Sequence, residues 1–152
     1  GKIRAFLTPG GHYRIKEDEF ERFMDKYVHS PNPEKILIVE DDPVQRKLLM
    51  DTLSAMEENY ILGSSEDGYD ALIKVGEFQP DLLITDIIMP KLDGVAVIKK
   101  IRSNAVTKAM KIIVVTSYPE ELGKVRTLIQ GFFIKPIEMD LLKSKIKELL
   151  GG

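Results

Sequence analysis

The sequence predicts an α/β protein: a five-stranded parallel sheet with helices on both faces, preceded by a small β-hairpin and a helix. Five short runs rich in Val, Ile and Leu alternate with segments whose apolar residues recur at helical spacing. Most of these runs are continuously apolar, which is typical of parallel strands buried on both faces. Right-handed crossovers between such strands place helices on both faces of the sheet.

The expected strands comprise residues 36–39, 60–62, 82–85, 112–115 and 132–134. The expected helices comprise residues 43–56, 69–78, 94–102, 120–129 and 139–150. Asp42 is placed to cap the first of these helices, and Pro43 suits its first position. The apolar face expected for this helix consists of Leu48, Leu49, Leu53 and Met56.

Composition excludes several classes of function. The chain has 152 residues, 43% of them hydrophobic and 30% charged, which fits one globular domain, or one with an appendage. A net charge of -2 argues against nucleic-acid binding over the whole surface, but it allows a local basic patch. The absence of cysteine excludes disulfides, zinc–thiolate sites and cysteine nucleophiles. No apolar run has the length of a membrane span and no signal peptide is visible, so we expect a cytoplasmic location without membrane partners.

The chain is expected to divide into a small unit at residues 1–29, a linker at 30–34 and the α/β domain at 35–150. Alternating residues on either side of Pro9-Gly10-Gly11 predict the hairpin, and residues 17–28 carry the helical pattern. Two prolines make the linker short and stiff. Because the first residue is Gly1 rather than Met, we expect a fragment or a chain that has lost a tag or segment.

Polar residues follow four of the expected strands directly. Glu40 and Asp41 follow the first strand, Asp86 the third, Thr116 the fourth and Lys135 the fifth. The functional crevice of an open parallel sheet lies beyond these carboxyl ends, so the five side chains should converge. Crowded carboxylates repel one another unless a cation screens them, and an all-oxygen set of ligands suits Mg²⁺.

A carboxylate beside Mg²⁺, a lysine and a hydroxyl is a plausible acceptor for a phosphoryl group, which would give an aspartyl phosphate at Asp86. No Gly-rich loop is present to hold a nucleotide, so the phosphate would arrive on another protein or on a small donor. Taken one at a time, these residues have simpler explanations. Asp86 would be a cap, Thr116 an ordinary strand-end residue, Lys135 a solvated lysine and Phe132 a core aromatic.

A second reading of Asp86 makes it the nucleophile of a phosphate-ester hydrolase. Such an enzyme needs a second acid–base carboxylate two residues further on, where this chain has the apolar Ile88. The sequence therefore disfavours hydrolase activity.

Residues 34–150 resemble a response-regulator receiver domain of two-component signalling. The resemblance rests on the ordered motifs Ile-Leu-Ile-Val-Glu40-Asp41-Asp42, Thr-Asp86-Ile-Ile-Met-Pro90-Lys-Leu-Asp-Gly94, Val-Val-Thr116-Ser117 and Lys135-Pro136. It implies a flavodoxin-like sheet with strand order 2-1-3-4-5. It also implies a protein that is not an enzyme, beyond catalysing phosphotransfer to its own aspartate and the hydrolysis of that phosphate.

The resemblance assigns a role to each site residue. Asp86 would be phosphorylated from the phosphohistidine of a sensor histidine kinase or phosphotransfer protein. The Mg²⁺ ligands would be Asp41, Asp86 and the backbone carbonyl of Ile88, with Glu40 acting through water. The remaining residues would bind the phosphoryl group or switch with it: Thr116 with its neighbour Ser117, Lys135 through a salt bridge, and Phe132 as the aromatic switch. The Lys135-Pro136 bond would be cis.

One segment departs from the family pattern. The stretch between Thr116 and Lys135 is a few residues shorter than in most family members, and its helix looks curtailed. Gly131-Phe132-Phe133 replaces the small and acidic residues that often precede the last strand. Because this region usually carries the signal to partners and to a dimer mate, the output surface and a possible homodimer stay open.

Residues Thr8 to Ile15 resemble the wing of excisionase-like (MerR-related) winged helix-turn-helix domains, although Tyr13 replaces the usual arginine. The resemblance implies that Arg4, His12 and Arg14 approach DNA phosphates or the minor groove, and that the recognition helix lies before Gly1. The simpler alternative is a structural appendage with solvated charges.

Together these patterns predict a transcriptional response regulator, in which the phosphate shifts a two-state equilibrium and controls a DNA-binding output. The alternative is a phosphorelay or protein-docking receiver module whose N-terminal hairpin binds protein rather than DNA.

Overall fold

The computed structural model describes residues 5–7, 13–15 and 33–151. The chain divides into two compact units, Gly1–Pro33 and Glu34–Gly152. In the first unit, strands β1 (Ala5–Leu7) and β2 (Tyr13–Ile15) pair antiparallel, with Phe6 opposite Arg14. The other features expected there, namely Arg4, His12, the helix at 17–28 and most of the linker, lie outside the described residues.

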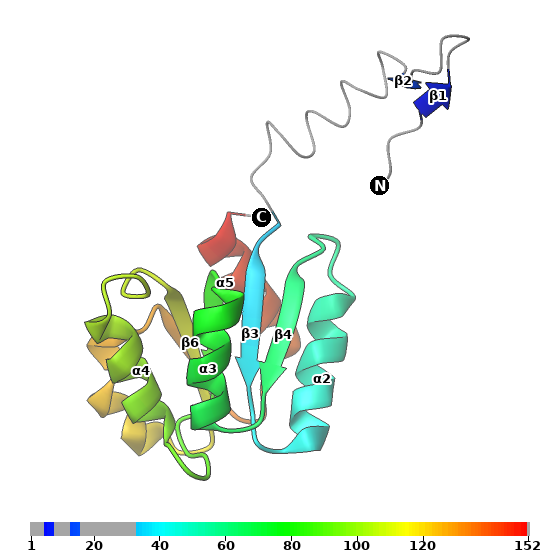
Figure 1. The fold of residues 1–152 in the computed structure, drawn as a ribbon. Coiled ribbons are helices and arrows are strands. Elements are labelled where there is room, and N and C mark those ends of the chain that lie inside the picture. The colour runs from blue at the N-terminus through cyan, green and yellow to red at the C-terminus, as the bar shows by residue number, and fades with distance from the viewer. Residues whose placement is uncertain (1–4, 8–12, 16–32, 152) are drawn as a thin grey trace. The chain divides into compact units, whose positions relative to one another are not determined.

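The second unit contains a five-stranded parallel sheet in the order β4-β3-β5-β6-β7 (Figure 1). Counted from β3, this is the predicted order 2-1-3-4-5, so the predicted sheet is confirmed. The strands are β3 (Lys35–Val39), β4 (Ile61–Ser65), β5 (Leu82–Thr85), β6 (Lys111–Thr116) and β7 (Gly131–Ile134).

Four α-helices cover the two faces of this sheet. They are α2 (Pro43–Ser54), α3 (Gly68–Phe78), α4 (Gly94–Ser103) and α5 (Met139–Leu150). One apolar core lies between the sheet and α3 with α4, and a second lies between the sheet and α2 with α5. Figure 1 shows α3 and α5 on opposite sides of the sheet. Alternate residues of β3 enter the two cores, Leu37 the first and Ile38 the second, as burial on both faces requires. Among the described residues, no helix is both long and apolar enough to span a bilayer.

Three helices, α2 after β3, α3 after β4 and α4 after β5, each have an aspartate cap. Asp42 accepts from the backbone N–H of Val44, and Pro43 occupies the first turn of α2, as predicted. Asp67 and Asp93 cap α3 and α4 in the same way. These caps gather acidic residues at one edge of the sheet.

The predicted apolar face of α2 is wrong at one position. Leu49, Leu53 and Met56 are buried, whereas Leu48 is about half exposed. Successive helical residues are about 100° apart, so the stripe that faces the sheet can hold Leu49 and Leu53 but not Leu48.

The α-helix predicted for residues 120–129 is also wrong. Two short 3₁₀ helices, η2 (Pro119–Lys124) and η3 (Arg126–Leu128), replace it. Between them Val125 has φ -131°, far from helical geometry. Gly123 and the β-branched Val125 and Thr127 have low helix propensity, which favours short 3₁₀ turns over a continuous helix.

Candidate functional site

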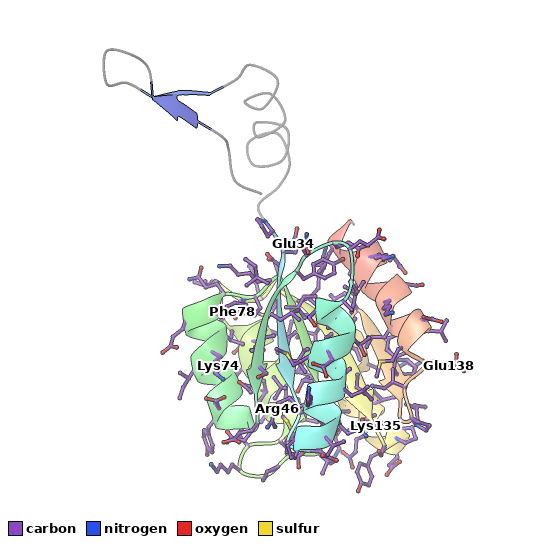
Figure 2. The ribbon with its side chains drawn as sticks, turned by 90° about the vertical axis from the view of Figure 1, so that its right-hand side faces the viewer. Glu34, Arg46, Lys74, Phe78, Lys135 and Glu138 are labelled. Carbon is purple, nitrogen blue, oxygen red and sulfur yellow. The ribbon has the colours of Figure 1, made fainter. Side chains whose placement is uncertain are left out.

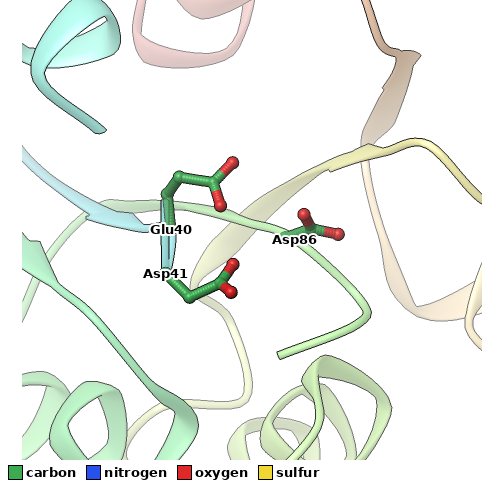
Figure 3. A group of neighbouring side chains, drawn as sticks. All are labelled: Glu40, Asp41 and Asp86. Carbon is green, nitrogen blue, oxygen red and sulfur yellow. The ribbon is translucent and has the colours of Figure 1, made fainter. Parts of the chain in front are cut away.

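Three carboxylates meet at the carboxyl edge of the sheet. Glu40 and Asp41 follow β3, Asp86 follows β5, and one oxygen from each side chain lies within 4.8 Å of the others (Figure 3). Because β3 and β5 are neighbours in the sheet, their ends bring together residues far apart in the sequence. The predicted convergence of these three residues is confirmed.

Lys135 joins this group from the end of β7. Its Nζ lies 2.6 Å from Glu40 Oε1 and 2.8 Å from Asp86 Oδ2. Its backbone N–H donates to the carbonyl oxygen of Thr116 at 2.9 Å, which ties the loop after β7 to the end of β6. The Lys135-Pro136 peptide bond is cis, as predicted. A simple solvated lysine is therefore excluded, because the ammonium bridges two carboxylates.

Burial and hydrogen bonding shift the pKa values of two charged groups in this site, Glu40 and Lys135. Glu40 is 2% exposed and Asp86 is 7% exposed, whereas Asp41 faces solvent. Removal from water raises the pKa of Glu40, and a hydrogen bond with Asp41 adds to the rise, while Lys135 opposes it. Burial acts to lower the pKa of Lys135, but the hydrogen bonds to Asp86 and Glu40 outweigh it and the net pKa is raised. The site has more negative than positive groups, so it favours a further cation.

The backbone orients the Asp86 carboxylate. Its Oδ1 accepts from the N–H groups of Ile87 at 2.7 Å and Ile88 at 3.3 Å, and its Oδ2 faces Lys135. Gly94 closes the loop by donating from its N–H to the carbonyl oxygen of Ile87 at 2.7 Å. A Cβ at Gly94 would lie 2.2 Å from the carbonyl oxygen of Asp86, so only glycine fits there. The sequence marks this glycine as a turn residue, but the close approach is visible only in three dimensions.

Contacts with α3 hold the far side of the same loop. A Cβ at Gly68 would lie 2.0 Å from the carbonyl oxygen of Leu92. Lys91 Nζ lies 3.3 Å from Asp67 Oδ2, and the φ of Lys91 is 69°. The backbone N–H of Asp70, together with Lys91, keeps the pKa of Asp67 below its ordinary value. The contacts of Gly68 with Leu92 and of Lys91 with Asp67 do not follow from the sequence, because they depend on how the two loops pack.

The expected switch residues lie on β6, directly after it, and on β7. Thr116 is fully buried at the end of β6, and its Oγ1 accepts from the N–H of Tyr118 at 2.9 Å. Ser117 is exposed. Phe132 pairs with Val114 in the sheet, is 37% exposed, and lies under the guanidinium of Arg126 at 5.0 Å. The idea that Phe132 is simply a core aromatic is therefore wrong.

The donor atoms in this cluster fit a hard divalent cation. Three carboxylates within 4.8 Å supply only oxygen, and the exposed Asp41 opens the group to solvent. Mg²⁺ prefers oxygen ligands and keeps several waters, so a partly open carboxylate set suits it.

The family model for the response regulator receiver domain matches residues 36–147. The chain belongs to this family. Receiver domains bind Mg²⁺ at an acidic pocket, and the position of the carboxylate cluster agrees with that property.

Two curated relatives show where such a receiver occurs. The chain is 41% identical over 90 residues to protein-glutamate methylesterase/protein-glutamine glutaminase 5 of Myxococcus xanthus, covering 59% of this chain and 25% of the relative. It is 32% identical over 119 residues to sensor histidine kinase TmoS of Ectopseudomonas mendocina, covering 76% of this chain and 12% of the relative. The chain thus spans a quarter or less of these two proteins.

Among solved structures, response regulator protein TrrA of Thermotoga maritima, in complex with Mg²⁺-BeF, is 35% identical to this chain. The match covers 76% of this chain and 98% of that one, with a TM-score of 0.67. The receiver fold therefore extends over nearly the whole of that structure.

Proposed function

We propose that this receiver accepts a phosphoryl group on Asp86 from the phosphohistidine of a sensor histidine kinase or phosphotransfer protein. The observation that carries the proposal is the bridge of Lys135 between Glu40 and Asp86, at 2.6 and 2.8 Å, beside a third carboxylate. A partly buried ammonium at this edge would pair with an incoming anion, and the Asp86 carboxylate would accept the phosphoryl group.

In the reaction, one carboxylate oxygen of Asp86 attacks phosphorus. A P–O bond forms as the P–N bond of phosphohistidine breaks, and that electron pair stays on the imidazole nitrogen. The backbone N–H groups of Ile87 and Ile88 orient the carboxylate, which reduces the cost of reaching the in-line geometry. The ammonium of Lys135 then forms a salt bridge with the phosphoryl oxygens, where the negative charge now lies. Attack by water on the same phosphorus releases inorganic phosphate and restores the carboxylate.

We assign the Mg²⁺ ligands to Asp41, Asp86 and the carbonyl of Ile88, with Glu40 held at one remove through water. The cation supplies the positive charge that offsets the phosphoryl oxygens and the carboxylates. The related protein TrrA has been solved in complex with Mg²⁺-BeF. Burial and the bond to Lys135 suit Glu40 to an indirect role, while the exposed Asp41 is free to bind directly.

Phosphorylation would rearrange three nearby residues, Thr116, Ser117 and Phe132. The hydroxyl of Thr116 would leave the N–H of Tyr118 to bond the phosphoryl group, with Ser117 beside it. Phe132 would then move from its exposed position toward the space that the hydroxyl vacates. This is a shift between two arrangements of packed groups, driven by the new charge.

We further propose that the output is DNA binding by a transcription regulator in the cytoplasm. The support is the basic N-terminal sequence, which carries Lys2, Arg4, Arg14 and Lys16 before the first acidic residue. The alternative is a relay or docking module whose hairpin binds protein. Fluorescence anisotropy with duplex DNA over a range of salt concentrations separates them: binding that weakens with salt favours DNA, and no binding at low salt favours protein.

Intact mass after incubation with acetyl phosphate tests the phosphoacceptor proposal. We expect one phosphoryl addition that requires Mg²⁺, disappears with EDTA and is absent in Asp86→Asn. Asp93→Asn is the matched control, because Asp93 caps α4 in the same loop and asparagine preserves a capping oxygen. Addition in Asp86→Asn, or no addition in the wild type with Mg²⁺ present, contradicts the proposal. Release of many phosphates per chain from a generic phosphomonoester would instead support a hydrolase.

A further inference from the structure

Arg46 contacts the main chain of the acidic turn, residues 40–42. It projects from α2, the helix that follows the turn, and is labelled in Figure 2. Its Nη1 donates to the carbonyl oxygen of Glu40 at 2.7 Å and approaches that of Asp41 at 3.5 Å. Hydrogen bonds from a charged donor are about twice as strong as neutral ones. The shorter of these two contacts therefore anchors the turn.

Both contacts involve main-chain carbonyls. Neither contact occupies a carboxylate oxygen, so Arg46 does not compete with Lys135 or with a cation for the side chains of Glu40 and Asp41. The peptide groups around Glu40 are then held on both sides, because the Glu40 N–H also donates to the carbonyl oxygen of Ser65 at 3.0 Å. The N–H of Asp42 donates to Glu40 Oε2 at 3.3 Å. Arg46 thus holds the main chain at Glu40 through its shorter contact and reaches the exposed Asp41 through the longer one.

We propose that Arg46 is a positioning residue of the cation site: it fixes the main chain of Glu40 and Asp41 so that both carboxylates point at the ion. The inference rests on the proposed function, since it assumes that Mg²⁺ binds there. Groups that orient metal ligands without touching the metal typically change metal affinity by about 10- to 100-fold when they are removed.

The sign of the effect separates this role from a simple charge effect. A guanidinium near a cation site repels the cation, so an Arg46 that acted only through its charge would weaken Mg²⁺ binding. Replacing it with a neutral residue would then tighten binding. A positioning role predicts weaker Mg²⁺ binding in the neutral variant, because the carboxylates are no longer held in place when the turn loosens.

The test measures Mg²⁺ affinity by isothermal titration calorimetry for the wild type, Arg46→Gln, Arg46→Lys and Lys47→Gln. Lys47 is the matched control: it is the next residue on the same helix, and it is exposed and paired with Asp51. We expect Arg46→Gln to weaken Mg²⁺ binding about 10-fold. Lys47→Gln loses the same charge and should leave the affinity within about twofold, because solvent and salt screen it.

Arg46→Lys keeps the charge but loses the planar guanidinium. We therefore expect its Mg²⁺ affinity to lie between those of the wild type and Arg46→Gln. Amide NMR shifts without Mg²⁺ add a readout independent of the ion: residues 40–42 should shift in Arg46→Gln and stay in place in Lys47→Gln. Thermal unfolding shows whether each variant is folded, and should Arg46→Gln fail to fold, Arg46→Lys decides the matter.

The outcomes separate the inference from the proposed function. A wild type that binds no Mg²⁺ overturns the proposed function and this inference with it. A wild type that binds, with an unchanged or tighter Kd in Arg46→Gln and a wild-type Kd in Arg46→Lys, overturns the positioning role alone.

Discussion

The acidic edge formed by the ends of β3 and β5 differs sharply from the segment that runs from Pro119 to Ile134. At the acidic edge, the strands before the carboxylates are fully buried and the turns are fixed by close backbone contacts. In the second segment two 3₁₀ helices replace an α-helix, and Phe132 and Ile134 on β7 are 37% and 48% exposed. The acidic edge follows two buried strands, whereas the second segment contributes Leu122 and Val125 to the core but leaves Phe132 and Ile134 exposed on β7.

This difference places the proposed phosphoacceptor site in a rigid region and the side chains expected to respond to it in a less tightly packed one. A carboxylate at the end of a buried strand keeps its position as long as the core stays packed, so the acidic edge is as stable as the whole domain. The side chains of β7 can change their packing at little cost in folding free energy. Three comparisons, each pairing a residue near the first region with one in the second, test this contrast, and a fourth change lies within the second region.

The largest difference is expected between two isoleucines. Ile84 is buried in β5 and Ile134 is half exposed in β7. Ile84→Ala should lower the free energy of unfolding by about 2–5 kcal/mol, because it leaves a cavity in the core. Ile134→Ala should cost less than about 1 kcal/mol. Urea denaturation measures both, and equal losses would show that β7 is as firmly packed as β5.

Two glycines give the next comparison. A Cβ at Gly68 would meet the carbonyl oxygen of Leu92 at 2.0 Å, whereas a Cβ at Gly123 in η2 would meet nothing within 4 Å. Gly68→Ala should destabilise the fold by about 3 kcal/mol, since a backbone must move. Gly123→Ala should leave stability unchanged or raise it by up to about 1 kcal/mol through the unfolded chain. If thermal unfolding showed Gly123→Ala to be the more destabilised variant, the close packing of the two loops would not be important for stability.

Two lysines compare ion pairs in the two regions. Lys135 bridges two buried carboxylates, while the pair between Lys124 and Glu121 lies on the surface. Lys135→Gln should lower stability by about 1–3 kcal/mol, because Glu40 and Asp86 lose their shared partner. Added Mg²⁺ should restore part of that loss by screening the carboxylates. Lys124→Gln should produce no measurable change. A Lys135→Gln variant as stable as the wild type without Mg²⁺ would show that the bridge contributes little.

The smallest effect is expected at Phe132. The guanidinium of Arg126 lies 5.0 Å from the centre of its ring, a contact worth about 0.5–1 kcal/mol at an exposed site. Arg126→Gln should therefore favour the inward position of Phe132 and speed phosphorylation by acetyl phosphate by up to about fivefold. In a Phe132→Leu background the same change should have no effect. An equal effect in both backgrounds would show that Arg126 acts without the ring.

The strand ends could be predicted from the sequence because apolar runs stop abruptly at polar residues. Glu40, Asp86 and Lys135 stand directly after such runs, and the rule for parallel sheets brings those ends together. Local chemistry also predicted the start of α2, since Asp42 and Pro43 act through bonds within one turn.

Features that depend on distant contacts could not be predicted. The second strand was expected to comprise residues 60–62. In the structure β4 continues to Ser65, since pairing with β3 overrides local preference. Arg46 was missed for a similar reason: a basic residue on an exposed helix has no signal in the sequence that shows which carbonyl it reaches.

The most direct test of the central claim is to locate the phosphoryl group. Borohydride reduces an acyl phosphate to an alcohol, so treatment after acetyl phosphate and Mg²⁺ marks the phosphorylated residue for tandem mass spectrometry. Conversion of Asp86 to homoserine, with Glu40, Asp41 and Asp93 unchanged, is the predicted result. Conversion at one of those three residues, or at none while Mg²⁺ binds, would contradict the assignment of Asp86 as the phosphoacceptor.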